Sequence, residues 1–145
     1  MFRRILYPTD FSDVSQKALE YIKRLKEAGA TEVVLLHVHD IRGDEAAHRV
    51  LGSSKFEQLQ KGLEKEAKKM LSKPEKELHE AGLKVKPMIR RGIPLKEILK
   101  VETEEDVSAI VIGSHGVSNI QEMFLGSVSE KVIRRCKKPV LVIKR

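Results

Sequence analysis

Short apolar runs along the chain alternate with longer stretches in which apolar residues recur every three or four positions. The runs at 5–7, 32–38, 107–112 and 139–143 are almost continuously apolar. Such runs are typical of strands that are covered on both faces of a parallel sheet. The run at 83–89 instead alternates apolar with basic residues and includes Pro87, which predicts a strand at the edge of the sheet.

The stretches between these runs have the spacing of helices. One helix is expected to begin after Ser12 as N-cap and to end before Gly29. A second is expected over 54–81, opening on the capping-box pattern Ser54-x-x-Glu57, with Pro74 kinking or splitting it. Two further helices are predicted, one from Pro94 and one over 127–135. The apolar stripe of the helix over 54–81 should pack on the sheet, which needs a cover, rather than form a coiled coil or bind a partner helix. Residues 39–53 show no clear period and are predicted to form a loop.

Five predicted strands alternate with four helical segments. Because parallel strands must cross over through helices, this order predicts an α/β fold with a doubly wound, five-stranded parallel sheet and helices on both faces. The elements use nearly all of the 145 residues, so we expect a single domain over 1–145.

Composition narrows the classes of function. One cysteine, Cys136, excludes an intramolecular disulfide framework and a multi-cysteine metal site, and it falls on the face of Val128 and Val132, where burial is expected. No apolar run approaches the length of a membrane span, so we expect a soluble, cytoplasmic protein with no membrane contact. The formal charge is +7, and residues 127–145 hold seven Lys or Arg and one Glu. This segment lacks aromatic residues for base stacking, which favours a solvated basic face over nucleic-acid binding.

Residues that could bind a ligand follow the ends of three of the predicted strands. Open α/β sheets bind ligands at the carboxyl ends of their strands. Polar residues or glycines follow the strands at 8–12, 37–40 and 113–116, and the last of these segments leads on to Gly126-Ser127 at a helix start. Glycines let backbone N–H groups approach a phosphate, and a helix N-terminus favours an anion. The alternative is that the glycines serve turn geometry only and that Ser127 caps its own helix with Glu130.

These segments, taken together, resemble the universal stress protein family. The resemblance rests on Pro8-Thr9-Asp10-Phe11-Ser12, Leu35-Leu36-His37-Val38, Gly113-Ser114-His115-Gly116 with nine residues to Gly126-Ser127, and the ending Lys138-Pro139-Val140-Leu141-Val142-Ile143. The spacing Gly-x2-Gly-x9-Gly-Ser is similar to that of the ATP-binding branch of the family. It matches neither a Walker loop nor the dinucleotide fingerprint.

The resemblance implies a site for ATP, ADP or AMP, with Mg²⁺ or Mn²⁺ as a candidate companion, and a homodimer formed through 139–143. Asp10 would accept a hydrogen bond from a ribose hydroxyl, and Val38 would contact adenine through its backbone. Val117 stands where the family often has a polar or basic residue, so a side-chain contact to phosphate is not expected there. The implied binding residues are Pro8, Thr9, Asp10, Val38, Ile112, Gly113, Ser114, His115, Gly116, Val117, Ser118, Gly126, Ser127 and Val128.

The implied function is a nucleotide-dependent regulator or stress factor. One alternative is a weak ATPase or nucleotidyl-transfer enzyme at the same site. However, the glycine segments 113–116 and 126–127 contain no Lys or Arg that could stabilise a transition state. Another is a nucleic-acid or protein-binding module that uses the basic C-terminal segment. Asp10 could also serve only the helix dipole. His37 is interpreted as a hydrogen-bonded core residue, and His39 and His115 receive no catalytic role.

Overall fold

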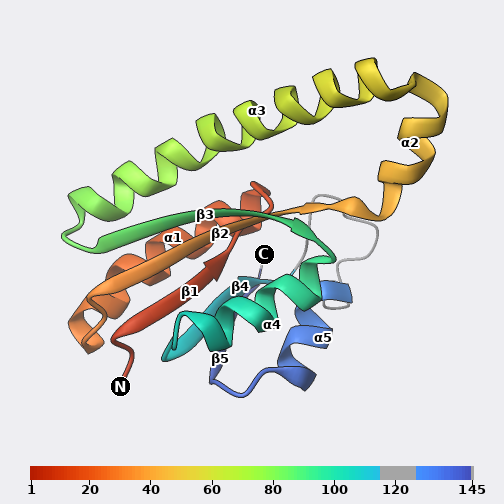
Figure 1. The fold of residues 1–145 in the computed structure, drawn as a ribbon. Helices are drawn as coiled ribbons and strands as arrows, with labels where there is room; N and C mark the ends of the chain where they lie inside the picture. The colour runs from red at the N-terminus through yellow and green to blue at the C-terminus, as the bar shows by residue number, and fades with distance from the viewer. Residues whose placement is uncertain (115–126, 145) are drawn as a thin grey trace.

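The computed structural model describes residues 1–114 and 127–144 and contains a five-stranded, fully parallel sheet (Figure 1). The strands lie in the order β3-β2-β1-β4-β5. Their bounds are β1 Arg4–Pro8, β2 Glu32–Asp40, β3 Lys84–Gly92, β4 Ala109–Gly113 and β5 Val140–Ile143. The predicted α/β fold is confirmed, and the basic, alternating strand lies at an edge as expected.

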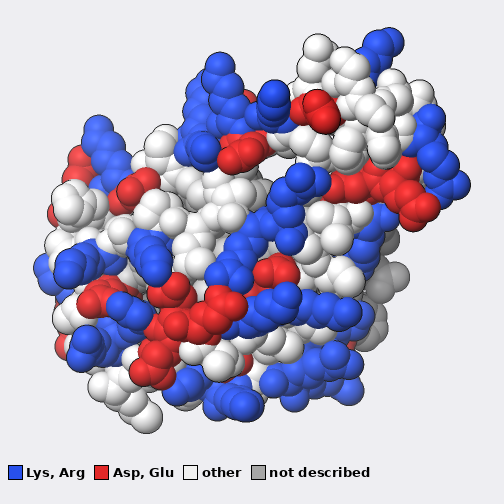
Figure 2. All heavy atoms as spheres, in the orientation of Figure 1, with Lys and Arg blue, Asp and Glu red and all other residues white. Residues whose placement is uncertain are grey.

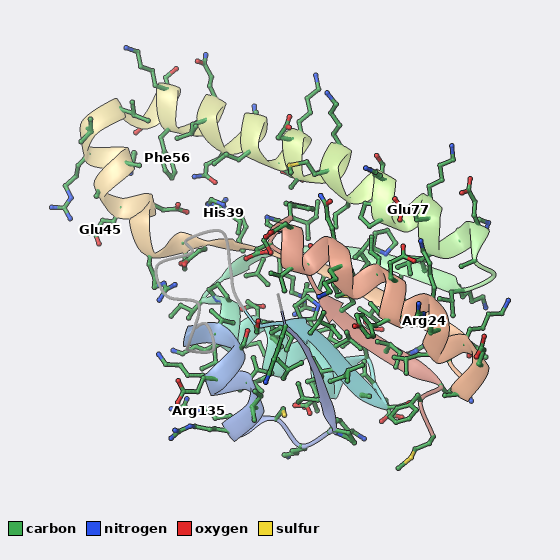
Figure 3. The ribbon with its side chains drawn as sticks, turned by 180° about the vertical axis from the view of Figure 1, so that it is seen from behind. Arg24, His39, Glu45, Phe56, Glu77 and Arg135 are labelled. Atoms are coloured by element: carbon green, nitrogen blue, oxygen red, sulfur yellow. The ribbon has the colours of Figure 1, made fainter. Side chains whose placement is uncertain are left out.

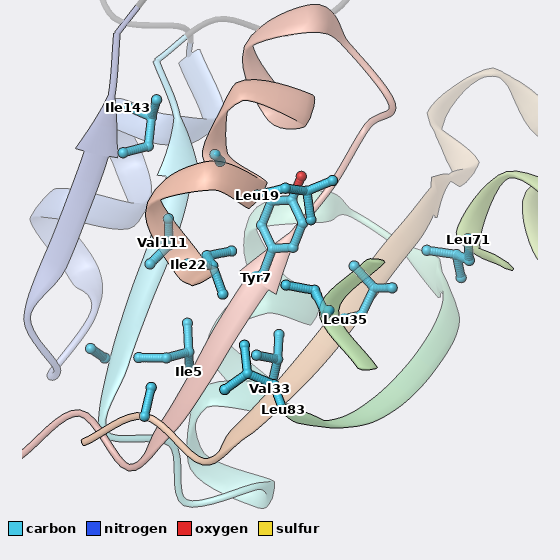
Figure 4. Packing of buried hydrophobic residues seen from close by; sticks show 14 residues of the cluster. Ile5, Tyr7, Leu19, Ile22, Val33, Leu35, Leu71, Leu83, Val111 and Ile143 are labelled. Carbon is cyan, nitrogen blue, oxygen red and sulfur yellow. The ribbon is translucent and has the colours of Figure 1, made fainter. Parts of the chain in front are cut away.

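Helices cover both faces of the sheet. The helices α1 (Asp13–Leu25) and α3 (Ser53–Glu80) lie on one face, and α4 (Pro94–Glu104) and α5 (Ser127–Arg135) lie on the other (Figure 1). Each face buries its own apolar cluster. Figure 4 shows the first cluster, in which Ile5, Tyr7 and Leu35 of the strands pack against Ile22 of α1. The second joins alternate strand residues to α4 and α5. This is the arrangement that nearly continuous apolar strands require.

The predicted start of the first helix is confirmed. The Ser12 hydroxyl accepts a hydrogen bond from the Ser15 N–H at 3.3 Å, so it satisfies one of the free donors of the first turn. The helix ends at Leu25 and continues as one 3-10 turn, Lys26–Ala28, before Gly29. Pro94 occupies the first turn of α4, also as predicted.

The loop predicted over 39–53 is wrong. Strand β2 continues to Asp40, and the chain then forms a 3-10 turn, Ile41–Gly43, and the helix α2, Asp44–Leu51. The Asp40 carboxylate accepts a hydrogen bond from the Arg42 N–H at 3.0 Å and so starts the turn. No residue of α2 is buried. The helix contacts the start of α3, where the rings of His48 and Phe56 lie 4.9 Å apart, but it spans only eight residues. Such a short helix is below the window in which helical periodicity can be recognised.

The predicted helix over 54–81 exists, but its capping box and the packing of its apolar stripe differ from the prediction. It begins at Ser53 after Gly52, and no side chain caps it, so Ser54 lies inside the first turn and forms no capping box. The helix also runs without interruption through Pro74, which is buried, so it is not split. Nor does its apolar stripe cover the sheet throughout, because Leu59 and Leu63 are 40% and 41% exposed.

Length explains this exposure. A helix of 28 residues is ~42 Å long, whereas the nine-residue strands below it span ~30 Å. Towards its start, α3 rises away from the sheet (Figure 1). We call residues 44–66, which comprise α2 and the first half of α3, the projecting arm. Only the second half buries side chains, starting from Ala67.

The surface carries charges of both signs. Figure 2 shows Lys and Arg gathered over α5, with Asp and Glu interspersed on neighbouring elements. Several of the basic residues in this region are paired, as in the contact of Arg134 with Glu130 at 2.9 Å. Cys136 is only partly buried, against the α4/α5 cluster, which is less than the sequence predicted.

Candidate functional site

The strand order reverses between β1 and β4. From β1 the chain moves to β2 and β3 on one side, whereas β4 lies on the other side of β1 and leads outward to β5. At such a reversal the segments that follow the two central strands diverge and leave a crevice at the carboxyl edge. Two of the three segments that carry the motifs, Pro8-Thr9-Asp10 and Gly113-Ser114, leave the sheet at this point.

Thr9 fixes the path of the chain after β1. Its N–H donates to the Leu36 carbonyl at 2.8 Å, and its hydroxyl accepts a hydrogen bond from the Ser15 hydroxyl at 2.6 Å. Thr9 is buried, and Phe11 behind it has a left-handed φ of 65°. The Thr9 side chain therefore holds the loop against α1.

Asp10 lies exposed at the beginning of α1. One of its carboxylate oxygens accepts a hydrogen bond from the Ser12 N–H at 3.0 Å. The local role of an acid at a helix start, which the sequence left open, is thus present. Because the side chain is exposed, the carboxylate is also accessible to a ligand, and the two roles are compatible.

Val38 lies where β2 continues past the end of β1. The pairing of these strands ends at Pro8 with Leu36, whose carbonyl points toward β1. Backbone groups two residues apart in a strand point to the same side. The N–H and C=O of Val38 therefore point beyond the last residue of β1, toward the crevice, while its side chain packs against the α4/α5 cluster.

Gly113 is the tightest position of the site. A Cβ on this residue would lie 3.0 Å from Cγ1 of Val14, so α1 approaches β4 so closely that a side chain here would require Val14 to shift. Ile112 before it is buried in the α4/α5 cluster. Ser114 after it is buried, and its N–H donates to the Ile143 carbonyl at 2.8 Å. This end of β4 is thus held from two directions.

Ser129 is a site residue that sequence reasoning missed. Its hydroxyl donates to the Gly113 carbonyl at 2.5 Å, and the residue is buried. The bond attaches the first turn of α5 to the end of β4. The signal in the sequence was a polar residue three positions before Val132, on the stripe of α5 that faces the sheet.

Two helix N-termini meet this edge, those of α1 and α5. The dipole at the N-terminus of a helix favours an anion. Val128, in the first turn of α5, packs against the core, so its side chain has a structural role. Five predicted binding residues and the side chain of Ser127 lie outside the residues that the structure describes; the five are His115, Gly116, Val117, Ser118 and Gly126.

His37 contacts the loop after β1. Nδ1 of His37 lies 3.0 Å from the Thr9 carbonyl, and its ring stacks on Phe11 with centroids 4.6 Å apart. The residue is hydrogen-bonded as predicted, although only half-buried.

His39 belongs to an ion-pair cluster with Asp44 and Arg91, with distances of 3.1 Å from Asp44 to each. Desolvation alone would raise the pKa of Asp44, but the hydrogen bonds from His39 and Arg91 hold that pKa below its ordinary value. The cluster ties the start of α2 to the ends of β2 and β3.

The part of the chain that the structure describes contains neither a metal-binding cluster nor a membrane-spanning helix. Within residues 1–114 and 127–144, no group of three or more His, Cys, Asp or Glu side chains could hold a metal ion. No described helix combines the length and apolar character needed to cross a membrane.

Comparison with known protein families shows to which family the chain belongs. The family model described as "Universal stress protein family" matches residues 1–144. The chain belongs to the universal stress protein family. The resemblance noted from the four sequence segments is therefore confirmed.

Several family members are similar over their full length. The universal stress protein MJ0577 of Methanocaldococcus jannaschii is 44% identical, with 100% of this chain and 96% of that protein covered. Its solved structure superimposes on this chain with a TM-score of 0.88, and the match covers 100% of this chain and 97% of that one. The Bacillus subtilis universal stress protein YxiE is 34% identical over 99% of this chain and 100% of its own length. The Archaeoglobus fulgidus universal stress protein in complex with dAMP, 24% identical with a TM-score of 0.62, shares the fold over 99% of this chain and 98% of its own.

Proposed function

We propose that this universal stress protein binds an adenine nucleotide, ATP in particular, at the carboxyl edge where β1 and β4 diverge. The observation that carries the proposal is the meeting of Pro8-Thr9-Asp10 and Gly113-Ser114 at the reversal of strand order. Family membership and the dAMP complex of the Archaeoglobus fulgidus relative support the ligand class.

Each part of the edge suits one part of the nucleotide. The exposed Asp10 carboxylate accepts a hydrogen bond from a ribose hydroxyl. The outward backbone groups of Val38 provide one donor and one acceptor for the adenine edge. The start of α5, with the glycine-rich segment before it, takes the phosphates. A Mg²⁺ or Mn²⁺ ion would draw its oxygen ligands mainly from those phosphates, since Mg²⁺ is commonly bound in this way.

Regulation by the nucleotide and pairing of two copies belong to the same proposal. Strand β5 ends the sheet, and its Leu141 is 41% exposed. An open edge of this kind can pair with the same edge of a second copy related by a two-fold axis. A cytoplasmic location and a single-domain organisation stay predictions.

The test is calorimetric titration of ATP into the wild-type protein and into Asp10→Ala. A lost hydrogen bond to a charged group weakens binding by roughly ten- to a hundredfold. Asp13→Ala is the matched control, because Asp13 lies in the first turn of the same helix. If Asp10 serves only the helix dipole, neither variant weakens ATP binding; if Asp10 contacts the ribose, only Asp10→Ala does. Absence of ATP binding by the wild type contradicts the proposal.

A further inference from the structure

Strand β2 continues past its neighbour β1 at the carboxyl edge of the sheet. The pairing of β1 with β2 ends at Pro8, whereas the pairing of β2 with β3 continues to Asp40. Among the strands that the structure describes, residues 37–40 therefore pair with β3 alone, and β3 is itself an edge strand. A two-stranded ribbon is marginally stable by itself. The position of Val38, which lies in this segment, therefore depends on contacts from outside the sheet.

Two histidines flank Val38 and hold this segment from outside. Their side chains lie on the face of the sheet opposite to that of Val38, because successive residues of a strand point to opposite faces. His37 contacts the Thr9 carbonyl and so ties the segment to the loop after β1. Nε2 of His39 lies 3.1 Å from Oδ1 of Asp44. Figure 3 shows His39 on the side of β2 that faces the projecting arm. Val38 is thus held through both of its neighbours in the chain.

Asp44, the first residue of α2, contacts both strands of the ribbon. Its Oδ1 accepts a hydrogen bond from His39 on β2, and its Oδ2 accepts one from Arg91 on β3, each at 3.1 Å. His39 and Arg91 lie opposite each other in the pairing of the two strands. The Asp44 side chain is only 19% exposed, and such partly buried ion pairs are screened less by solvent than exposed ones. One carboxylate therefore joins the two strands where β1 no longer supports them.

We propose that Asp44 is a positioning residue for the nucleotide. By joining His39 to Arg91, its carboxylate holds the backbone of Val38 in place for adenine. The inference rests on the proposed function, in which the N–H and C=O of Val38 contact the adenine edge. A hydrogen bond of ordinary length is lost once its two heavy atoms separate by roughly a further 0.7 Å. A small displacement of the ribbon is therefore enough to remove the adenine contacts, although Asp44 itself does not touch the nucleotide.

The test measures the preference for ATP over inosine triphosphate. Inosine has a carbonyl where adenine has its amino group, and its N1 carries a hydrogen, so the donor and the acceptor that Val38 would meet are reversed. Calorimetric titration should show that the wild type binds ATP ~10-fold or more tightly than inosine triphosphate. Asp44→Ala should reduce this preference ~3-fold or more, because the Val38 backbone is no longer held. A loss of stability alone would weaken both nucleotides equally and leave the preference unchanged.

Glu45→Ala is the matched control for Asp44→Ala. Glu45 is the next residue in the first turn of α2, and its carboxylate pairs with Arg49 of the same helix at 3.3 Å. This variant should keep the full preference for ATP. Arg91→Ala should reduce the preference as Asp44→Ala does, and the double variant should lose no more than either single variant, because both residues act through the same contact. Strictly additive losses would contradict a joint action of the two residues.

The outcomes separate this inference from the proposed function. Absence of ATP binding by the wild type contradicts both. Equal binding of the two nucleotides by the wild type contradicts the adenine contact of Val38, and with it the role of Asp44, but leaves a nucleotide site in place. A full preference for ATP in Asp44→Ala contradicts the positioning role alone. The amide resonance of Val38 in the nucleotide-free protein should also shift in Asp44→Ala and not in Glu45→Ala, and an unchanged resonance in both would overturn the inference.

Discussion

The hydroxyl of Ser129 donates a hydrogen bond to the carbonyl of Gly113 across 2.5 Å, within a buried environment. This bond joins the end of β4, the neighbour of the central strand β1, to the first turn of α5. The glycine-rich segment connects these two ends, so the bond helps to hold the ends of the proposed phosphate site together.

Ser129→Ala should destabilise the fold and weaken nucleotide binding together. Removal of the hydroxyl leaves a buried carbonyl without its partner, at a cost of about 1–3 kcal/mol. Urea unfolding measures this loss. Ser72→Ala is the control, because the Ser72 hydroxyl also bonds a carbonyl but is exposed. A similar loss of unfolding free energy in both variants would show that the burial of Ser129 does not strengthen its contribution to stability.

Gly113→Ala should destabilise the protein by about 1–3 kcal/mol through overpacking. The added methyl would lie 3.0 Å from Cγ1 of Val14. The double variant Gly113→Ala/Val14→Ala should recover part of the loss, because the second change removes the atom that clashes. Strictly additive losses in a double-mutant cycle would mean that the two residues do not interact.

Two glycines of the projecting arm should respond oppositely to alanine. Gly62 lies inside α3 with open space where a Cβ would be, so Gly62→Ala should stabilise the protein by about 0.5–1 kcal/mol. Gly52 has a φ of +78° at the start of the helix, so Gly52→Ala should destabilise it. Thermal unfolding of both variants checks the pair, and equal shifts would contradict the described start of α3.

The Asp44 cluster should make stability depend on pH. The folded state lowers the pKa of Asp44 through hydrogen bonds from His39 and Arg91. The stabilisation is therefore present above the unfolded pKa of about 3.9 and is lost as pH falls through the lower folded value. Asp44→Asn should lose stability relative to wild type at about pH 5 and much less near pH 2.

Urea unfolding at the two pH values measures this difference. In an Arg91→Gln background the effect of Asp44→Asn should shrink, because one of its partners is already gone. An unchanged difference across pH would show that Asp44 is not ionised preferentially in the fold.

The sequence predicted the parts of the fold that burial controls. Apolar runs such as Val33 to Leu36 had to lie between two layers, and Pro94 and Ser12 marked helix starts by their own chemistry. It failed where contacts are local or solvent-facing. The helix α2 is short and buries no residue. Ser54 follows a capping pattern that the structure does not use, because α3 begins one residue earlier, at Ser53.

The site divides in the same way. Asp10 and Gly113 were found because strand ends in a parallel sheet meet at one edge, which follows from topology alone. The bond from Ser129 to Gly113 joins residues 16 positions apart. It leaves no pattern along the chain that spacing could reveal.

The most direct test of the central claim is to map ATP binding on the backbone amides by NMR. We predict that saturating ATP shifts the amide resonances of Thr9 to Ser12, Val38 and Gly113 most strongly. The amide resonances of Leu19 in α1, Met70 in α3 and Gly62 in the projecting arm should stay unchanged. Shifts confined to these last three residues, or no shifts at all, would contradict a nucleotide site at the reversal of strand order.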